Sequence, residues 1–436
     1  MSRVLVLGAG PAGAAVALGL RRLGHDVCVV SEWRRFAALE GVSPRVLEGL
    51  RGAGLLRALA AASEPSQRQV QWNGQRTAQN LEYLLDRPRF DQGLRDDLHA
   101  AGIALIEGRV LSVERDAGQM GVTLEGAAPV FADFLVEARG RQAPQASKAS
   151  SGRAWRGPET LSLLNRWQGQ PGPNASAVQS FSDGWAWMAR QADGRCYWQL
   201  TLDVASTQLP DKAALLDYCR ARRQQSEMAC RFFGAAEEHD LHLHARSSTA
   251  ILSRQTGAEG WLRVGDAAMA VDPLSGNGIF QSLSSALQAP AVINTLLQRP
   301  ERAALALQFH QQRVEHLFWR FARNGRDFYA QEQQWPDAPF WQARSCWPDQ
   351  APAHQEADFA ALQVQAGPVL RDGWVDEVEL VVSPDQPMGI WHVQGVAVAP
   401  LVKRLKHEPA EQVLAGLEPE QARMIRSWLL SQGYRP

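Results

Sequence analysis

Two glycine-rich stretches carry the residues whose types and spacing could do chemistry. The first is a G-x-G-x-x-G pattern near the start of the chain, made by Gly8, Gly10, Pro11, Ala12 and Gly13. Glycines at this spacing allow a tight turn whose backbone can approach a pyrophosphate at a helix N-terminus. Glu32 follows at the distance expected of an acid that accepts hydrogen bonds from ribose hydroxyls. The stretch therefore predicts dinucleotide binding.

The second stretch comes late in the chain and consists of Gly265, Asp266, Pro273, Gly276, Asn277 and Gly278. A turn of this composition presents backbone N–H groups at the positive end of a helix, which suits an anion or a polarised ring carbonyl. Gly276 and Gly278 would let a flat ring lie against the main chain, where a Cβ would clash. Taken alone, the pattern also fits any glycine-rich turn between a strand and a helix.

The elements that must position these turns can be read around them. Apolar strands at 3–7 and 27–30 flank an Ala/Leu-rich helix at 14–23, which is the β–α–β setting that the early glycines require. A short strand at 261–264 precedes the late turn, and an apolar helix begins at Phe280. The pattern predicts an α/β fold of the Rossmann type. The early glycine turn is expected to hold one end of a long cofactor, and the late turn is expected to hold the other end.

A third motif, residues 87–94 (RPRFDQGL), lies between the two. Together the three motifs resemble FAD-dependent monooxygenases of the p-hydroxybenzoate hydroxylase class and the related flavin-dependent halogenases, over residues 1–330. The resemblance implies FAD as the cofactor and places Arg87 at the flavin or its phosphates. The alternative for Arg87 is an ordinary solvated arginine.

Within this superfamily the chain most resembles the flavoprotein monooxygenases that dihydroxylate a protein tryptophan during tryptophylquinone maturation of quinohemoprotein amine dehydrogenase. The resemblance implies hydroxylation of an electron-rich aromatic ring by a flavin C4a-hydroperoxide. It also implies a small tryptophan-containing subunit as polypeptide substrate, and O₂ with an electron donor, either NAD(P)H or a flavin reductase. Arg139-Gly140 stands where the family has Asp-Gly, in a motif that serves both FAD and the pyridine nucleotide. Direct reduction by NAD(P)H is therefore left open.

Other functions remain as alternatives, namely a small-molecule aromatic hydroxylase, a tryptophan halogenase and a non-catalytic flavin-binding assembly factor. The family's halogenases relay hypohalous acid through a lysine in the first third of the chain, but Lys148 is the first lysine here. They also carry a glutamate where this chain has Ser275. Both differences argue against halogenation.

Large aromatic residues alternate on two predicted strands in the middle of the chain, at Trp185, Trp187 and Trp198. They could form a hydrophobic core or an aromatic wall for an indole-sized substrate. His242 and His244 share one strand face, but with no third ligand nearby we expect no metal site. No acid or base can be assigned from the sequence.

The predicted domains are discontinuous. Residues 1–65, 86–148 and 251–330 are expected to form the FAD-binding domain, with an α+β substrate domain from residues 66–85 and 149–250. Residues 331–436 are expected to form an aromatic-rich segment and a small winged-helix-like module, with a hairpin from strands at 375–382 and 389–398. That module could recognise a protein substrate or serve only in dimerisation or packing.

Composition narrows the function further. The chain has 436 residues, of which 45% are hydrophobic, and a net charge of −1, so nothing indicates nucleic-acid binding. Five scattered cysteines without a C-x-x-C pair are typical of reduced thiols in the cytoplasm. We identify neither an export signal nor a membrane span.

Overall fold

The computed structural model describes residues 2–34, 36–116, 118–144, 154–234, 239–276 and 278–435. The chain divides into two compact units, which are described separately. The first contains Met1–Pro290 and Phe321–Gln350, and the second contains Ala291–Arg320 and Ala351–Pro436.

A six-stranded sheet forms the base of the first unit, in the order β18-β19-β10-β1-β2-β6. All neighbouring strands are parallel except β18, which pairs antiparallel with β19. The strands are β1 (Arg3–Leu7), β2 (Asp26–Ser31), β6 (Ala104–Glu107), β10 (Phe134–Glu137), β18 (Gly257–Ala258) and β19 (Trp261–Arg263). This arrangement confirms the predicted Rossmann-type α/β class.

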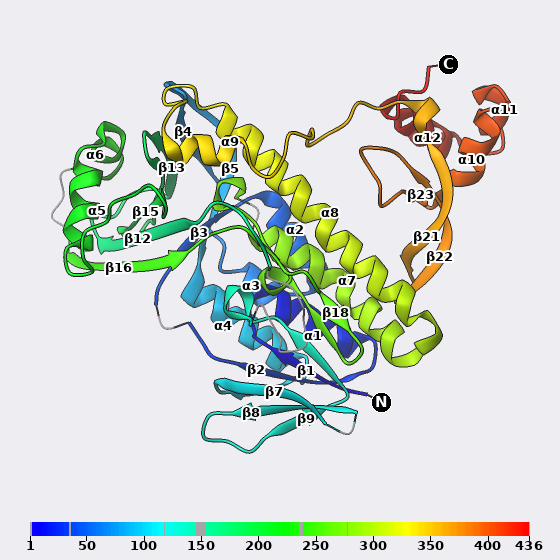
Figure 1. Ribbon diagram of the computed structural model, residues 1–436, viewed down its shortest axis with the longest axis horizontal. Helices are drawn as coiled ribbons and strands as arrows, with labels where there is room; N and C mark the ends of the chain where they lie inside the picture. The colour runs from blue at the N-terminus through cyan, green and yellow to red at the C-terminus, as the bar shows by residue number, and fades with distance from the viewer. Residues whose placement is uncertain are drawn as a thin grey trace. The chain divides into compact units, whose positions relative to one another are not determined.

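Helices and a small sheet surround this parallel sheet (Figure 1). The helices are α1 (Pro11–Arg22), α2 (Pro44–Ala53), α3 (Leu56–Leu59), α4 (Arg87–Ala100) and the start of α7 (Gly278–Gln298). The small sheet consists of β7 (Val110–Asp116), β8 (Gln119–Leu124) and β9 (Val130–Ala132). Its Val122 and Leu124 pack with Leu5 and Leu7 of β1 in one buried cluster, so the small sheet lies against the parallel sheet.

An eight-stranded sheet forms the rest of the first unit, in the order β16-β12-β15-β14-β13-β4-β5-β3. Its strands are β3 (Leu39–Val42), β4 (Ser66–Trp72), β5 (Gln75–Asp86), β12 (Thr160–Gln168), β13 (Ala175–Phe181), β14 (Gly184–Arg190), β15 (Arg195–Asp203) and β16 (His239–Ser247). Helices α5 (Leu215–Gln224) and α6 (Glu227–Phe233) cover one face (Figure 1). The other face packs on α9 (Pro339–Ser345) and on Tyr329.

The aromatic-rich segment after residue 330 belongs to this first unit, whereas the sequence analysis grouped it with the C-terminal module. Phe340 and Trp341 are each 1% exposed and pack on Trp185 and Tyr329 in the same core cluster. Burying these large rings is the physical reason why the chain returns to the first unit as far as Gln350.

Short elements complete the first unit. A three-stranded sheet joins β11 (Trp155–Arg156), β17 (Ile251–Leu252) and β20 (Met269–Ala270). Three short 3₁₀ helices lie at Gly140–Gln142, Gly265–Ala267 and Pro273–Ser275.

The second unit combines the end of α7 and most of α8 (Ala303–Ala330) with the C-terminal residues. Its strands are β21 (Gln363–Arg371), β22 (Trp374–Val382), β23 (His392–Val393) and β24 (Val396–Ala397), and its C-terminal helices are α10 (Val398–Leu405), α11 (Ala410–Leu414) and α12 (Pro419–Ser431). The apolar faces of the three helices form one core with Leu362 and Val381.

The hairpin of this unit differs from the prediction. β22 pairs with β21 across Asp372 and Gly373, whose φ values of 52° and 80° suit a two-residue hairpin turn. The predicted partner at 389–398 pairs with β22 through a single bridge between Val381 and Ile390, and it contains the short strands β23 and β24. Gly367 and Pro368 interrupt the pattern of β21 in the sequence, which concealed it as a strand.

Candidate functional site

The early glycine turn is built as its pattern requires. Gly8 has φ +103°, and a Cβ on Gly13 would lie 1.8 Å from the Gly8 carbonyl oxygen, so both positions demand glycine. A Cβ built on Gly10 meets no atom within 4 Å, and Gly10 lines a large cavity. Since α1 begins at the next residue, the cavity starts at the positive end of this helix.

The late turn lies beside the early one. A Cβ on Gly265 would come within 2.7 Å of the Ala12 Cβ, which shows how closely the two motifs approach. Gly276 and Gly278 also leave open space where a Cβ would stand, and both line the cavity. Bare backbone therefore borders the cavity from two directions, as a cofactor with a pyrophosphate and a planar ring would require. Asn277 lies outside the described residues.

The cavity has a volume of about 1910 Å³ and lies wholly within the first unit. Of the predicted site residues, the following line it: Gly8, Gly10, Pro11, Ala12, Glu32, Arg87, Trp185, Trp187, Asp266, Pro273, Gly276 and Gly278. Gly13 and Gly265 do not line it but shape the turns. Residues far apart in the sequence thus meet around one space.

Trp198 lies elsewhere, although the sequence analysis grouped it with the other two tryptophans. It is fully buried in the cluster that packs against α5 and α6. Trp185 and Trp187 belong to the cluster on the opposite face of the sheet. The aromatic wall of the cavity therefore contains Trp185 and Trp187 without Trp198.

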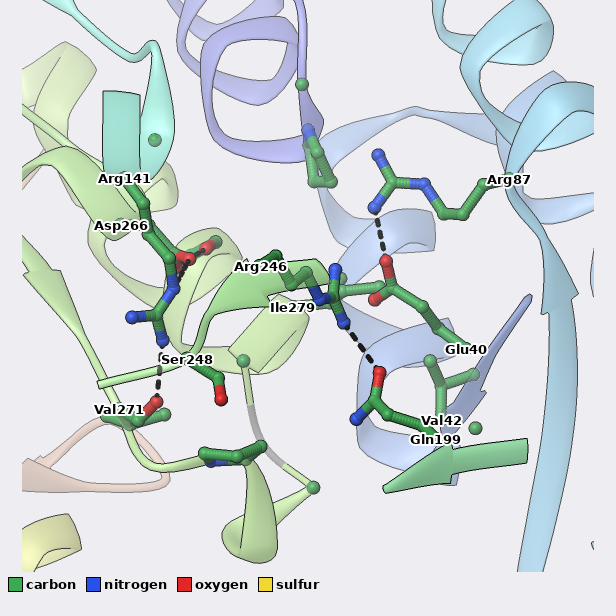
Figure 2. A pocket seen from close by; sticks show the side chains of 18 of the residues that line it. Glu40, Val42, Arg87, Arg141, Gln199, Arg246, Ser248, Asp266, Val271 and Ile279 are labelled. Carbon is green, nitrogen blue, oxygen red and sulfur yellow. Dashed lines mark hydrogen bonds and ion pairs between the residues drawn. The ribbon is translucent and has the colours of Figure 1, made fainter. Parts of the chain in front are cut away.

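Arg87 is held by two carboxylates at the cavity wall. Its Nη1 donates to Glu40 Oε1 at 2.7 Å (Figure 2). Its Nη2 donates to Asp91 Oδ1 at 2.7 Å. Burial raises the pKa of Glu40, but the charges of Arg87 and Arg34 outweigh this and hold that pKa at about 2. No sequence motif distinguishes Glu40, which lies in the short strand β3.

Two further arginines reach the cavity beside the late turn. Arg141 donates to the carbonyl of Val271 at 3.0 Å, and its Nε lies 3.6 Å from Asp266 Oδ2. Burial raises the pKa of Asp266, whereas Arg141 and a hydrogen bond from Ser282 lower it in part. Figure 2 shows Arg246 of β16 extending into the cavity between Asp266 and Glu40, where it donates to Gln199 Oε1 at 3.1 Å. No motif distinguished Arg246 from the exposed residues of its strand.

The two tryptophans of the wall are fixed by their indole N–H groups. Trp187 Nε1 donates to Glu82 Oε2 at 3.3 Å, and Trp185 Nε1 donates to the Tyr329 hydroxyl at 3.3 Å. Tyr329 in turn donates to Asp272 Oδ1 at 2.9 Å. Burial raises the pKa of Asp272. Burial and the negative charge of Asp272 together raise the pKa of Tyr329 well above its ordinary value. Two carboxylates, Glu82 and Asp272, therefore stand on the cavity wall beside the indole rings.

The paired histidines have separate surroundings. His244 lies 4.2 Å from Phe36, measured between ring centroids, and lines the cavity. His242 contacts Asp240 at 2.8 Å. Within the described ranges, no group of three or more His, Cys, Asp or Glu side chains could hold a metal ion. In the same part of the chain, no helix is long and apolar enough to cross a membrane.

Comparisons with known proteins agree with this geometry. A model of the FAD binding domain family matches residues 1–317. A tryptophan 2-halogenase of Chondromyces crocatus is 24% identical over 391 residues, which span 81% of this chain and 72% of the relative. Among solved structures, the peptidyl tryptophan dihydroxylase QhpG, essential for tryptophylquinone cofactor biogenesis, is 62% identical, covers 100% of both chains and has a TM-score of 0.89. The flavin-dependent halogenase CmlS is 16% identical, covers 99% of this chain and 95% of its own, and has a TM-score of 0.78, which shows a shared fold.

Proposed function

The chain belongs to the FAD binding domain family, in the branch of the peptidyl tryptophan dihydroxylase QhpG, and we propose that it hydroxylates a tryptophan side chain in a polypeptide during quinone cofactor biogenesis. It is an FAD-dependent monooxygenase, as its sequence motifs predict. The small-molecule hydroxylase and the non-catalytic assembly factor both fit the chain less well than this activity does, because neither accounts for full-length identity of 62% to a dihydroxylase.

The residues at the two glycine turns fit FAD. We propose that the turn at Gly8–Gly13 holds the pyrophosphate, that Glu32 holds a ribose, and that the backbone at Gly276 and Gly278 faces the flavin ring. FAD held in this way would supply, after reduction, an electrophilic oxygen atom derived from O₂. The protein must hold the cofactor, exclude water and present one edge of the substrate ring.

The observation that carries the proposal is that the two glycine turns and the aromatic wall of Trp185 and Trp187 line one cavity. Its volume of about 1910 Å³ exceeds the range of roughly 300–1,000 Å³ typical of small-ligand sites. The space beyond the cofactor is bordered by Trp185 and Trp187, whose N–H groups are engaged and whose rings can pack against an indole. A side chain carried on a polypeptide could enter from the exposed rim.

Each hydroxylation combines the aromatic ring, O₂, two electrons and two protons to give the hydroxylated ring and water. The carbon that gains oxygen must lose its proton, so a base is needed beside the ring. We assign this role to Asp272, a carboxylate on the cavity wall whose pKa is raised by burial. The electrons are proposed to come from NAD(P)H or a flavin reductase.

Halogenation is a second candidate because halogenases share the fold. The family's halogenases use a lysine relay, and no lysine occurs among the described residues that line this cavity. We therefore favour oxygen transfer without a halide step. A cytoplasmic location is also proposed, supported by the five cysteines, all described in the structure and none of them in a disulfide.

The test supplies the FAD-loaded protein with the small tryptophan-containing subunit, a reductant, ¹⁸O₂ and excess bromide. We expect the subunit to gain one or two ¹⁸O atoms and no bromine, measured by peptide mass spectrometry. A brominated tryptophan would establish the halogenase instead. Oxygen incorporation into a free indole, with none into the subunit, would establish a small-molecule hydroxylase.

A further inference from the structure

One long edge of the eight-stranded sheet is open beside the cavity. β5 pairs with β4 from Gln75 to Glu82, but its other side pairs with β3 only from Tyr83 to Asp86. Among the strands that the structure describes, none pairs with this side of the preceding residues, Gln75–Glu82. An open strand edge of this kind presents backbone N–H and C=O groups to any extended chain that approaches.

This edge is accessible and has few of the features that usually block edges. The side chains described between Gln75 and Leu81 are exposed, and Leu81 is 51% exposed. The segment contains no proline, and Arg76 is its only charged residue up to Leu81. Its one irregularity is a register shift opposite Arg68–Val70. The edge therefore remains able to accept a further strand.

The open edge is continuous with the cavity. Gln75, Thr77, Asn80 and Glu82 all line it. β3 ends at Val42, which pairs with Tyr83, and the chain then turns away into α2. A strand added here would therefore take the position next to β5 that β3 leaves empty. The residue opposite Glu82 would lie beside Trp187, since Glu82 accepts the hydrogen bond of that indole.

We propose that the polypeptide substrate adds as a strand to the edge of β5 at Gln75–Glu82 and thereby delivers its tryptophan to the cavity. The inference rests on the proposed function and specifies how that substrate binds. Strand addition obtains affinity from main-chain hydrogen bonds and specificity from pockets for alternate side chains. The cavity beside Glu82 and Trp187 is such a pocket for one aromatic side chain.

The hairpin geometry identifies a variant that tests the edge. Asn73 and Gly74 have φ values of 49° and 69°, as in a type I′ turn, so the flanking pair Trp72–Gln75 exchanges hydrogen bonds. Hydrogen-bonded and non-hydrogen-bonded pairs alternate along an antiparallel ladder, so the next pair, Gln71–Arg76, is not hydrogen-bonded. The N–H and C=O of Arg76 therefore point toward the open side of β5. Arg76→Pro removes this N–H without removing a hydrogen bond to β4. Arg76→Ala removes only the side chain, which contacts Glu227 at 3.8 Å.

The dissociation constant of the tryptophan-containing subunit is then measured for both variants of the FAD-loaded protein. We expect Arg76→Pro to weaken binding at least tenfold and Arg76→Ala less than twofold, with FAD absorbance unchanged in both. Hydrogen exchange on the wild-type protein gives an independent measurement, in which the Arg76 amide should slow when the subunit is added.

Equal affinities for the two variants, or no added protection of Gln75–Glu82, would overturn the edge as the binding site. Hydroxylation of the subunit by the wild-type protein would in that case still support the proposed function. Absence of any binding or modification by the wild type would overturn both.

Discussion

At the scale of single residues, Glu40 shows how charge is balanced beside the cofactor turns. Burial opposes its ionisation, yet Arg87 and Arg34 hold its pKa at about 2. Arg87 is 7% exposed, so removal of the Glu40 carboxylate would leave a buried cation with Asp91 as its remaining carboxylate partner. Glu40 thus keeps Arg87 in position for the cofactor role predicted for it.

Glu40→Gln should destabilise the protein in a pH-dependent way. The folded pKa of about 2 lies below the ordinary value of 4.5, so the stabilisation is complete above pH 4.5 and is lost as the pH falls toward 2. Urea unfolding should show that the substitution lowers the free energy of unfolding by about 3 kcal/mol at pH 7. At pH 3.5 this decrease should be smaller by roughly 1 kcal/mol. The exposed Glu48→Gln serves as the control. A difference that does not change with pH would contradict the argument.

Gly10→Val should abolish FAD binding while the fold remains. The Cβ of residue 10 would enter open space, so the substitution creates no clash within the protein, but it fills the place proposed for the pyrophosphate. The measurement is flavin absorbance after gel filtration, with a thermal melt to verify folding. Gly52→Val is the matched control, because its Cβ also meets no atom and Gly52 does not line the cavity. Full retention of FAD by the Gly10 variant would refute the role of the turn.

Asp272→Asn should slow hydroxylation with FAD still bound. Asparagine can still accept the hydrogen bonds from Tyr329 and Leu274, but it cannot take up the ring proton. We expect the single-turnover rate to fall by about 100-fold. The acid limb of the pH profile, which follows the raised pKa of Asp272, should disappear. The exposed Asp337→Asn is the control, and an unchanged rate and profile would remove Asp272 from the mechanism.

At the scale of elements, strong local patterns predicted the structure well. The β–α–β unit around Gly8–Gly13 was predicted because its apolar strands, its Ala/Leu-rich helix and its glycine turn all indicate the same structure. Strand β21 was missed because Gly367 and Pro368 obscure it, and only its pairing with β22 identifies it. Likewise, which face of the sheet Trp198 occupies depends on the helices that pack there, and short-range pattern does not specify those contacts.

The hairpin β21–β22 should depend on one hydroxyl of α7. Val375 N donates to Thr295 Oγ1 at 2.9 Å, and both groups are buried. Thr295→Val keeps the side-chain volume but leaves this N–H without its acceptor, at an expected cost of about 1–3 kcal/mol. Thermal unfolding measures the loss, with the exposed Thr123→Val as control. An equal melting temperature would show that another acceptor replaces the hydroxyl.

At the scale of the whole molecule, the division of the chain differs from the sequence prediction. Residues 291–320 join the C-terminal residues in the second unit, and Asn294 Nδ2 donates to the Gly373 carbonyl at 3.0 Å. Within the second unit, the C-terminal residues therefore pack on the end of helix α7. Trp374, Trp391 and Trp428 of this module are half-buried, and the Arg299 guanidinium lies 3.9 Å from the centre of the Trp374 ring.

Recognition of the polypeptide by residues 356–436 remains a prediction. Deleting them should leave FAD bound, because every residue that lines the cavity lies in the first unit. Hydroxylation of the small subunit should fall at least 100-fold, a coupling energy of about 2.7 kcal/mol. Oxygen incorporation into a free indole is the internal control. The deletion also removes Gly373 and Val375, the hydrogen-bond partners of Asn294 and Thr295, so a thermal melt measures how much stability is lost. Undiminished modification of the subunit would assign recognition to the first unit alone.

The tryptophan wall raises a question of self-damage. An enzyme that oxidises tryptophan, and whose own cavity is lined with tryptophan, must keep its reactive oxygen from its own side chains. Trp185 and Trp187 are 4% and 9% exposed, and their N–H groups are already bonded to Tyr329 and Glu82. They cannot rotate to offer a ring edge without breaking those bonds in a buried site. The same hydrogen bonds that shape the pocket therefore also keep these two rings from being oxidised when no substrate is bound.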